Sequence, residues 1–221
     1  MIAYNQAVSK ESRPQKQLRL KKIIRLLQEV YPDAHCALVH RNAFELLVAT
    51  ILSAQCTDKR VNMVTPDLFL RYPDAPSLAT AKPSELEGII RSTGFYRNKA
   101  KHLLALGKAL VKTHAGMVPQ TMESLVKLSG VGRKTANVVL GNAFGKPAGV
   151  VVDTHVTRIS RLLKLATSKT AEKIELELNH LVPASDWVLL PHLLIEHGRQ
   201  VCIARRPRCA QCVIAPFCPS Q

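Results

Sequence analysis

Short segments with helical periodicity, separated by prolines and glycines, follow one another along most of this 221-residue chain. One stretch, GVVVD at 149–153, has the composition of a β-strand, and a single strand cannot form a sheet. The pattern therefore predicts an all-α protein built of short helices with tight connections. The expected helices cover residues 16–30, 42–54, 57–71, 84–91, 98–113, 121–128, 133–143, 155–165, 170–181 and 187–197.

Two segments near the start of the chain differ sharply in polarity. Residues 1–15 are polar and basic without periodicity, which predicts a flexible tail, and they lack the apolar region of a secretory signal. Residues 42–54 are apolar nearly all round, which indicates a fully buried helix. No stretch approaches the roughly 18 apolar residues of a membrane span, so we expect no association with a membrane.

The charge of the chain indicates the class of its partner. It contains 31 lysines and arginines against 16 aspartates and glutamates, a formal net charge of +15. An excess of this size indicates a polyanionic partner, and it favours nucleic acid over a membrane surface. Charge alone does not name a function.

Four of the six cysteines lie in the last 20 residues, with the spacing C-x6-C-x2-C-x5-C. Four thiolates this close in sequence can enclose one metal centre, for which zinc and a [4Fe–4S] cluster are the candidates by ligand count. The single CxxC pair favours the cluster, because structural zinc sites more often carry two such pairs. Disulfides are the alternative, and the lack of a secretory signal argues against them. The expected ligands are Cys202, Cys209, Cys212 and Cys218.

The sequence between the first two of these cysteines, IARRPR, carries three arginines on a short loop. Because the metal would pin both ends of the loop, we expect Arg205, Arg206 and Arg208 to form a rigid basic finger that contacts phosphates. Contacts of this kind hold a nucleic acid without specifying its sequence.

Residues 121–140, TMESLVKLSGVGRKTANVVL, predict a helix, a tight turn and a second helix. Gly130 and Gly132 allow a sharp turn and a close approach of the backbone to a ligand. The N–H groups at the start of the second helix can then hold a phosphate. An ordinary pair of helices with a glycine C-cap is the alternative. The longer string LSGVGRKTAN resembles the helix-hairpin-helix motif of DNA repair proteins.

Three motifs in this order, LSGVGRKTANVV, VVDTHVTR and the cysteine spacing, closely resemble the endonuclease III family. These are iron–sulfur DNA glycosylases and abasic-site lyases, and the resemblance covers about residues 16–218. It implies two helical domains with a DNA-binding cleft between them. Residues 36–147 would form a helical barrel with the hairpin. Residues 16–35 and 148–221 would form a second domain that holds a [4Fe–4S] cluster in the loop 202–218.

The resemblance also implies an activity. The chain would be a bifunctional enzyme of base excision repair, which removes oxidised pyrimidines from duplex DNA and cleaves abasic sites by β-elimination. It would act as a monomer on damaged double-stranded DNA, in the bacterial cytoplasm and on the nucleoid. Two alternatives are the adenine-removing mismatch glycosylase of the same superfamily, which lacks a nucleophilic lysine, and a catalytically silent DNA-binding module. The presence of Lys134, together with Asp153, argues against both.

The nucleophilic lysine of the family matches Lys134, and its essential aspartate matches Asp153. A free lysine has a pKa of about 10.4, so a nucleophilic amine requires a pKa lowered by roughly 2–3 units. The helix N-terminus, the neighbouring Arg133 and partial burial are expected to lower it. Asp153 is expected to stabilise the developing oxocarbenium charge and to relay protons. The alternative, compatible with that role, is that Asp153 caps the following helix.

The same match implies contacts with DNA. Gln55 would enter the base stack in place of an extruded nucleotide, and Asp58 and His155 would lie at the lesion pocket. Phe95 stands where the family usually has an aliphatic wedge, and a ring there can stack on bases. Ser129 is a second departure, because the family commonly has proline at this place. The residues expected to grip the DNA backbone are those of the hairpin: Gly130, Val131, Gly132 and Arg133.

Overall fold

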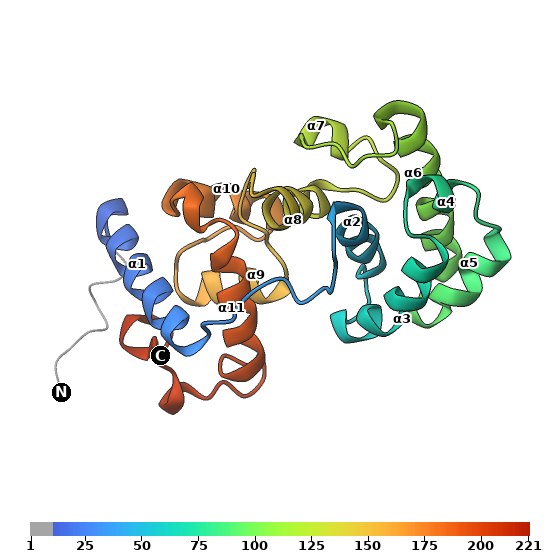
Figure 1. Cartoon of the computed structure of the whole chain (residues 1–221). Coiled ribbons are helices and arrows are strands. Elements are labelled where there is room, and N and C mark those ends of the chain that lie inside the picture. Colours follow the sequence, from blue (N-terminus) through green and yellow to red (C-terminus); the bar gives the residue numbers. More distant parts are fainter. Residues whose placement is uncertain (1–10) are drawn as a thin grey trace. The chain divides into compact units, whose positions relative to one another are not determined.

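The computed structural model describes residues 11–221, and within this range the chain is helical (Figure 1). Helices and short 3₁₀ turns are joined by loops, and no β-strand occurs among these residues. The predicted all-α class is therefore confirmed. Of the tail predicted for residues 1–15, residues 1–10 lie outside the described residues. From residue 11 onward, every helix is too short or too polar to span a bilayer.

The chain divides into two compact units, each with its own apolar core. One unit is continuous and comprises residues 36–148. The other, which we call the split unit, combines residues 11–35 with residues 149–221. The split unit is therefore assembled from segments that lie far apart in the sequence.

In the continuous unit, α2 is the central element, and nearly all of its residues are buried, as its apolar sequence predicts. It packs against α8, α3 and α6. Helices α4 and α6 also pack together, and a Cβ on Gly107 of α6 would lie 2.7 Å from the Ala79 backbone nitrogen. The elements are α2 (Ala43–Leu52), α3 (Asp58–Arg71), α4 (Ala75–Ala79), α5 (Pro83–Ile90), η2 (Arg91–Thr93), α6 (Tyr96–His114), α7 (Met122–Leu125) and α8 (Arg133–Phe144).

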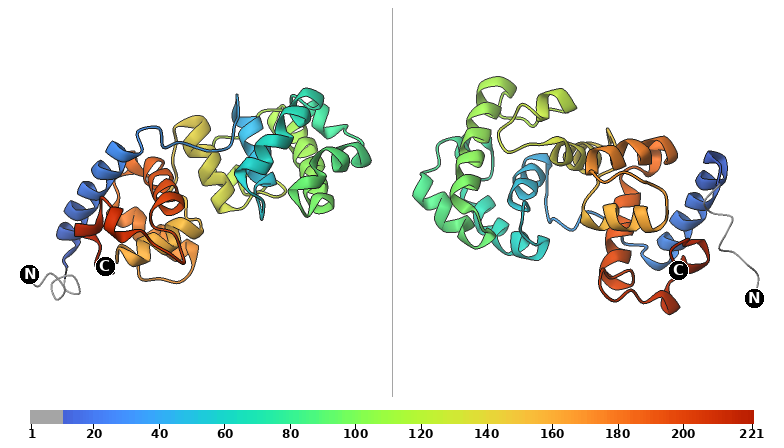
Figure 2. Two further views of the ribbon diagram at one scale, coloured as in Figure 1. Left: turned by 90° about the horizontal axis from the view of Figure 1, so that it is seen from below. Right: turned by 180° about the vertical axis from the view of Figure 1, so that it is seen from behind.

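In the split unit, α11 packs against α9 and α1, and α1 also contacts α10. Both views of Figure 2 show the C-terminal segment beside α1. Arg19 of α1 connects this helix to the C-terminal segment and to the end of α9. Its guanidinium donates to the carbonyl oxygens of Phe217 and Leu163, each at 3.0 Å. The elements are α1 (Arg13–Val30), α9 (Thr154–Leu162), α10 (Ala171–Leu181), η3 (Ala184–Asp186), α11 (Leu189–Gln200), η4 (Cys209–Gln211) and η5 (Ala215–Phe217).

The structure corrects several predicted boundaries. Helix α1 begins at Arg13, inside the predicted tail, because Ser12 and Gln15 form a capping box and a proline occupies the first turn. Helix α7 is shorter than the helix predicted for 121–128. The short α4 was not predicted; Asp74 caps it. Residues 149–153 form no strand.

Candidate nucleic-acid interface and metal centre

The predicted hairpin consists of α7, a turn and α8. Gly130 in the turn has φ +78°, and a Cβ on it would lie 3.1 Å from His102 Cβ, so backbone and space both favour glycine. Gly132 is the N-cap of α8, and no side chain caps this helix. The first N–H groups of α8 have no carbonyl partner earlier in the helix, which makes this end suited to hold a phosphate.

A contact from α6 braces the hairpin. His102 Nδ1 lies 2.9 Å from Ser129 Oγ, and the His102 ring packs beside Gly130. Ser129 thus makes a side-chain hydrogen bond that proline could not make. The two residues are 27 positions apart, so local sequence patterns could not predict their contact.

Val131 differs from the other residues of the turn. Its side chain is buried in the core of the continuous unit, and its N–H donates to the Leu128 carbonyl oxygen at 3.1 Å. The Val131 side chain therefore packs inward, and the predicted contact of Val131 with DNA, which could involve only its main chain, stays a prediction. Gly130 and Gly132 are exposed.

Lys134 is the second residue of α8, and its side chain is exposed beside the exposed Arg133. The partial burial predicted for Lys134 is not found, because α8 turns Ala136 and Asn137 toward the core and its first turn toward solvent. The amine is thus accessible at the electropositive end of a helix.

Asp153 is the N-cap of α9, where its Oδ1 accepts a hydrogen bond from the Val156 N–H at 2.8 Å. The capping role considered for Asp153 is therefore present. The bond fixes the orientation of a half-buried carboxylate at the start of the helix. Because one oxygen accepts this bond, the second can serve another purpose.

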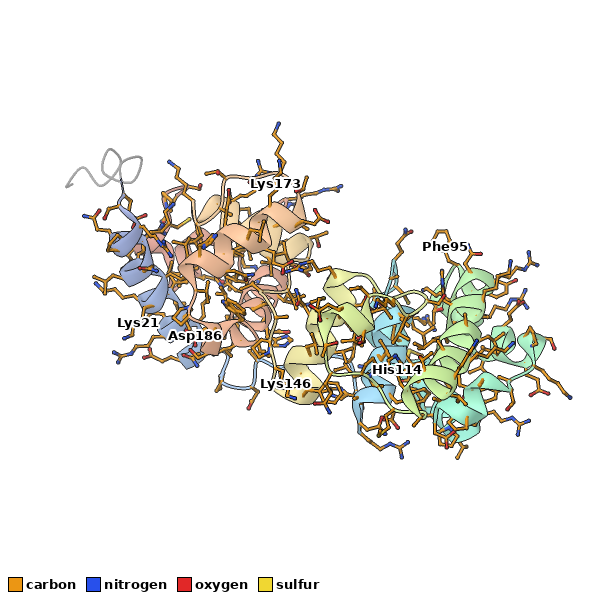
Figure 3. All side chains as sticks on the ribbon, turned by 90° about the horizontal axis from the view of Figure 1, so that it is seen from above. Lys21, Phe95, His114, Lys146, Lys173 and Asp186 are labelled. Carbon is orange, nitrogen blue, oxygen red and sulfur yellow. The ribbon has the colours of Figure 1, made fainter. Side chains whose placement is uncertain are left out.

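Gln55 and Phe95 occupy two exposed turns of the continuous unit. Gln55 follows α2 with φ 52°, and Phe95 precedes α6 with φ 48°. Figure 3 shows Phe95 and His114 at opposite ends of α6. Phe95 is 64% exposed, so its ring is accessible from solvent.

The two residues predicted to lie at the lesion pocket belong to different units. Asp58 is half-buried and opens α3, three residues after Gln55. His155 lies on α9 with its Nδ1 3.2 Å from Arg158 Nη2. A Cβ on Gly198 would lie 2.6 Å from the same nitrogen, so His155 packs closely against α11.

The four cysteines near the C-terminus line one cavity of about 40 Å³ in the split unit. Burial raises the pKa of the Cys202 and Cys212 thiols, and the neighbouring cysteines add to this effect, whereas Arg158 opposes it at Cys202. A positively charged centre would favour their thiolates. Among residues 11–221, no three His, Cys, Asp or Glu side chains stand close enough to share one metal ion.

His197 is a residue of this region that the sequence patterns did not predict. Its side chain is buried, with Nε2 3.5 Å from Cys212 Sγ and Nδ1 3.2 Å from the Tyr31 hydroxyl. Burial, and then Arg158, lower the pKa of His197 to about 4. A neutral imidazole that accepts from Tyr31 has its Nε2 proton to donate toward the sulfur. His197 precedes the cysteine run, and its spacing from it matches no ligand motif.

The loop between Cys202 and Cys209 is closed by its own backbone. The N–H groups of Ile203 and Arg208 both donate to the Val201 carbonyl oxygen at 2.9 Å. The arginine side chains of this loop are all exposed: Arg205, Arg206 and Arg208. The three arginines are therefore accessible, and their contact with phosphates stays a prediction.

This chain is similar to known proteins over most of its length. The model of the HhH-GPD superfamily of base excision DNA repair proteins matches residues 48–184. Endonuclease III of Synechocystis sp. is 51% identical over 205 residues, which cover 93% of this chain and 94% of that protein. The chain belongs to the endonuclease III family. Endonuclease III of Bacillus subtilis is 46% identical over 91% of the chain and 93% of its own length, and that of Escherichia coli is 42% identical over 89% and 92%.

Solved structures of endonuclease III give the same result. A non-covalent complex of endonuclease III with DNA matches with a TM-score of 0.87 and 42% identity, over 92% of this chain and 95% of that one. A trapped covalent intermediate of endonuclease III with DNA matches with a TM-score of 0.86 and 41% identity, over 92% and 96%. Membership of the endonuclease III family also indicates a metal cofactor for this chain.

Proposed function

We propose that this chain is a bifunctional DNA glycosylase and abasic-site lyase that removes oxidised pyrimidines from duplex DNA. The position of Lys134 is the observation that carries the proposal. Its exposed amine lies in the first turn of α8, directly after a glycine turn suited to hold a phosphate. A nucleophile at this position can reach the sugar of a nucleotide whose backbone the hairpin holds.

The chemistry requires one amine. The unprotonated Lys134 nitrogen attacks C1′ of the damaged nucleotide, the C1′–N bond breaks, and the base leaves with the bonding electrons and takes up a proton. Loss of the amine proton and opening of the sugar ring give an imine between protein and sugar. The imine acidifies the C2′ proton, and its removal expels the 3′ phosphate. One residue thus serves both base removal and strand cleavage.

Asp153 is proposed to assist by stabilising the positive charge that develops on the sugar and by relaying protons. The hydrogen bond from the Val156 N–H supports this role, because it holds the carboxylate in one orientation. Capping and catalysis are therefore compatible uses of the same side chain.

The proposed DNA contacts follow from exposure and chemistry. A base must leave the duplex before its glycosidic bond can be attacked, and the gap must be filled. We assign the filling to the exposed side chains of Gln55 and Phe95. Asp58 and His155 are assigned to the lesion pocket. The contacts proposed for the phosphate backbone are Gly130, Gly132, Arg133, Arg205, Arg206 and Arg208.

For the metal cofactor we propose a [4Fe–4S] cluster. All four cysteines line one cavity of the split unit, and their spacing contains a single CxxC pair, which favours a cluster over a structural zinc site. Cys202 and Cys209 would hold the two ends of the basic loop when the cluster is bound, and the cluster would supply a redox-active group.

The proposed place of action is the bacterial nucleoid. The chain's relatives named above are bacterial, and the substrate of the proposed reaction is chromosomal DNA. The formal charge of +15 supports retention on such a polyanion.

The test is borohydride reduction with duplex DNA that contains thymine glycol or an abasic site. Because borohydride reduces the imine to a stable amine, the wild-type chain is expected to give a covalent protein–DNA adduct, and Lys134→Ala none. Lys127→Ala, which removes an exposed lysine from the same hairpin, is the matched control and is expected to trap DNA like the wild type. A covalent adduct formed by Lys134→Ala would overturn the assignment.

A further inference from the structure

Lys99 of α6 is a buried lysine in a chain whose basic side chains are mostly exposed. Only 5% of the residue is exposed. Its ammonium donates two hydrogen bonds of 2.8 Å, one to the Leu52 carbonyl oxygen and one to the Thr93 carbonyl oxygen. Both partners are neutral backbone groups.

The two carbonyls belong to the ends of two different elements. Leu52 is the last residue of α2, and the turn that carries Gln55 follows it. Thr93 is the last residue of η2, and Gly94 and Phe95 follow it. The Lys99 ammonium therefore joins the bases of both exposed turns, which are otherwise distant in sequence.

Both turns contain a backbone conformation that needs support. Gln55 and Phe95 have φ 52° and 48°, the left-handed region that side chains other than glycine rarely adopt. Residues held there persist where the surrounding structure holds them. The two bonds from Lys99 lie three and two residues before these positions.

The burial of Lys99 is costly. Desolvation lowers the pKa of its ammonium, and the nearby Cys56 partly opposes this effect. An apolar side chain of similar length, such as methionine, would fill the same space without the cost of desolvation. The ammonium supplies what methionine lacks, namely donors that reach two carbonyls at once.

We propose that Lys99 is a positioning residue for base extrusion, which holds the Gln55 and Phe95 turns in one geometry so that both side chains enter the DNA together. This inference rests on the proposed function, in which Gln55 and Phe95 fill the gap left by the damaged base. Turns that are already ordered do not lose conformational entropy when they enter the duplex. Loss of Lys99 therefore weakens extrusion and leaves the chemistry at Lys134 unchanged.

The expected loss of excision rate in Lys99→Met depends on the free energy needed to extrude the damaged base. A damaged base that is paired and stacked is harder to extrude than one that is mismatched or unpaired. Lys99→Met is therefore expected to slow excision strongly when thymine glycol lies opposite adenine. The loss is expected to be small when the lesion lies opposite a one-nucleotide gap.

The experiment compares Lys99→Met with Lys108→Met, an exposed lysine of the same helix, in single-turnover excision from both duplexes. We expect Lys99→Met to lose about 10- to 100-fold on the paired lesion and less than about threefold opposite the gap, and Lys108→Met to match the wild type. Fluorescence of 2-aminopurine beside the lesion reports insertion directly, and its change on binding is expected to be lost in Lys99→Met.

Three results would decide against the inference: equal losses on both duplexes, a 2-aminopurine change on binding equal to that of the wild type, or full activity of Lys99→Met. If Lys99→Met does not fold, Lys99→Gln, whose amide carries two N–H donors on a shorter side chain, is measured, and a smaller loss that is again greater on the paired lesion than opposite the gap is expected. A double variant with Gln55→Ala adds a second criterion, because residues that act through one another have non-additive effects. A wild-type chain inactive on both duplexes would refute the proposed function itself, so the two failures are distinguishable.

Discussion

The two units hold the exposed side chains that are proposed to contact DNA by different means. In the continuous unit, helix packing and hydrogen bonds fix the turns: His102 braces Ser129, and Lys99 bonds to two carbonyls. In the split unit, the segment 201–221 contributes one fully buried apolar side chain, Ile214. Of the four cysteines around its cavity, Cys202, Cys212 and Cys218 are half-buried and Cys209 is exposed.

This difference indicates which segments of the chain depend on the metal cofactor for their stability. A turn supported by a packed helix is formed by the chain alone, because burial of apolar surface stabilises it. A segment with little buried apolar surface needs another source of stability, and metal ligation supplies it. We therefore expect the cofactor to matter for the arginine loop and not for the hairpin.

Removal of a cysteine is expected to have the greatest effect on the difference between the two units. Cys212→Ala is expected to lower the free energy of unfolding of the split unit by about 3 kcal/mol or more, because four-ligand metal sites contribute folding energy directly. Hydrogen exchange should accelerate across 201–221 and α11, with α2 and α6 unchanged, and bound iron should fall.

The matched control is Cys56→Ala, which removes a half-buried thiol from the continuous unit. It is expected to leave both iron content and exchange in 201–221 at wild-type values. Wild-type protection and iron content in Cys212→Ala would contradict a metal-dependent C-terminal segment.

Asp153 lies in the split unit, yet a local hydrogen bond at the start of α9 holds it in place. Asp153→Asn keeps a good capping residue and removes the carboxylate. We expect a loss of about 10²-fold or more in single-turnover excision, with melting temperature nearly unchanged. Asp153→Ala should lose similar activity and about 1 kcal/mol of stability. Excision at the wild-type rate by Asp153→Asn would show that Asp153 caps α9 and takes no part in catalysis.

The smallest expected effect concerns the arginine loop. The double variant Arg205→Ala, Arg206→Ala is expected to weaken DNA binding and to reduce the slope of log K against log salt by up to roughly 1.8, about 0.9 for each phosphate contact. Lys169→Ala with Lys173→Ala, two exposed lysines of the split unit, removes the same charge as a control. Equal slopes for the two double variants would mean that the loop supplies only general attraction.

Much of the fold was predictable from local patterns. The apolar run at 42–54 became the buried α2, and the string LSGVGRKTAN became a turn followed by α8. The start of α1 was missed, because the capping box at Ser12 counts for more than the polarity of the segment. The prediction that Lys134 is partly buried was wrong. A residue in the first turn of a helix can face either the solvent or the core, and local sequence patterns do not distinguish the two orientations.

The candidate site likewise has features that the sequence predicts and features that depend on tertiary packing. Local sequence patterns were enough to predict the helical class, the hairpin and the cysteine spacing, and to point to Lys134 and Asp153, because periodicity and short spacings are properties of neighbouring residues. Tertiary packing was needed to show that Val131 packs inward, that His197 meets Cys212, and that Lys99 lies buried against Leu52. The last pair is 47 residues apart. Contacts over such separations depend on how helices pack, and packing is specified by the whole core.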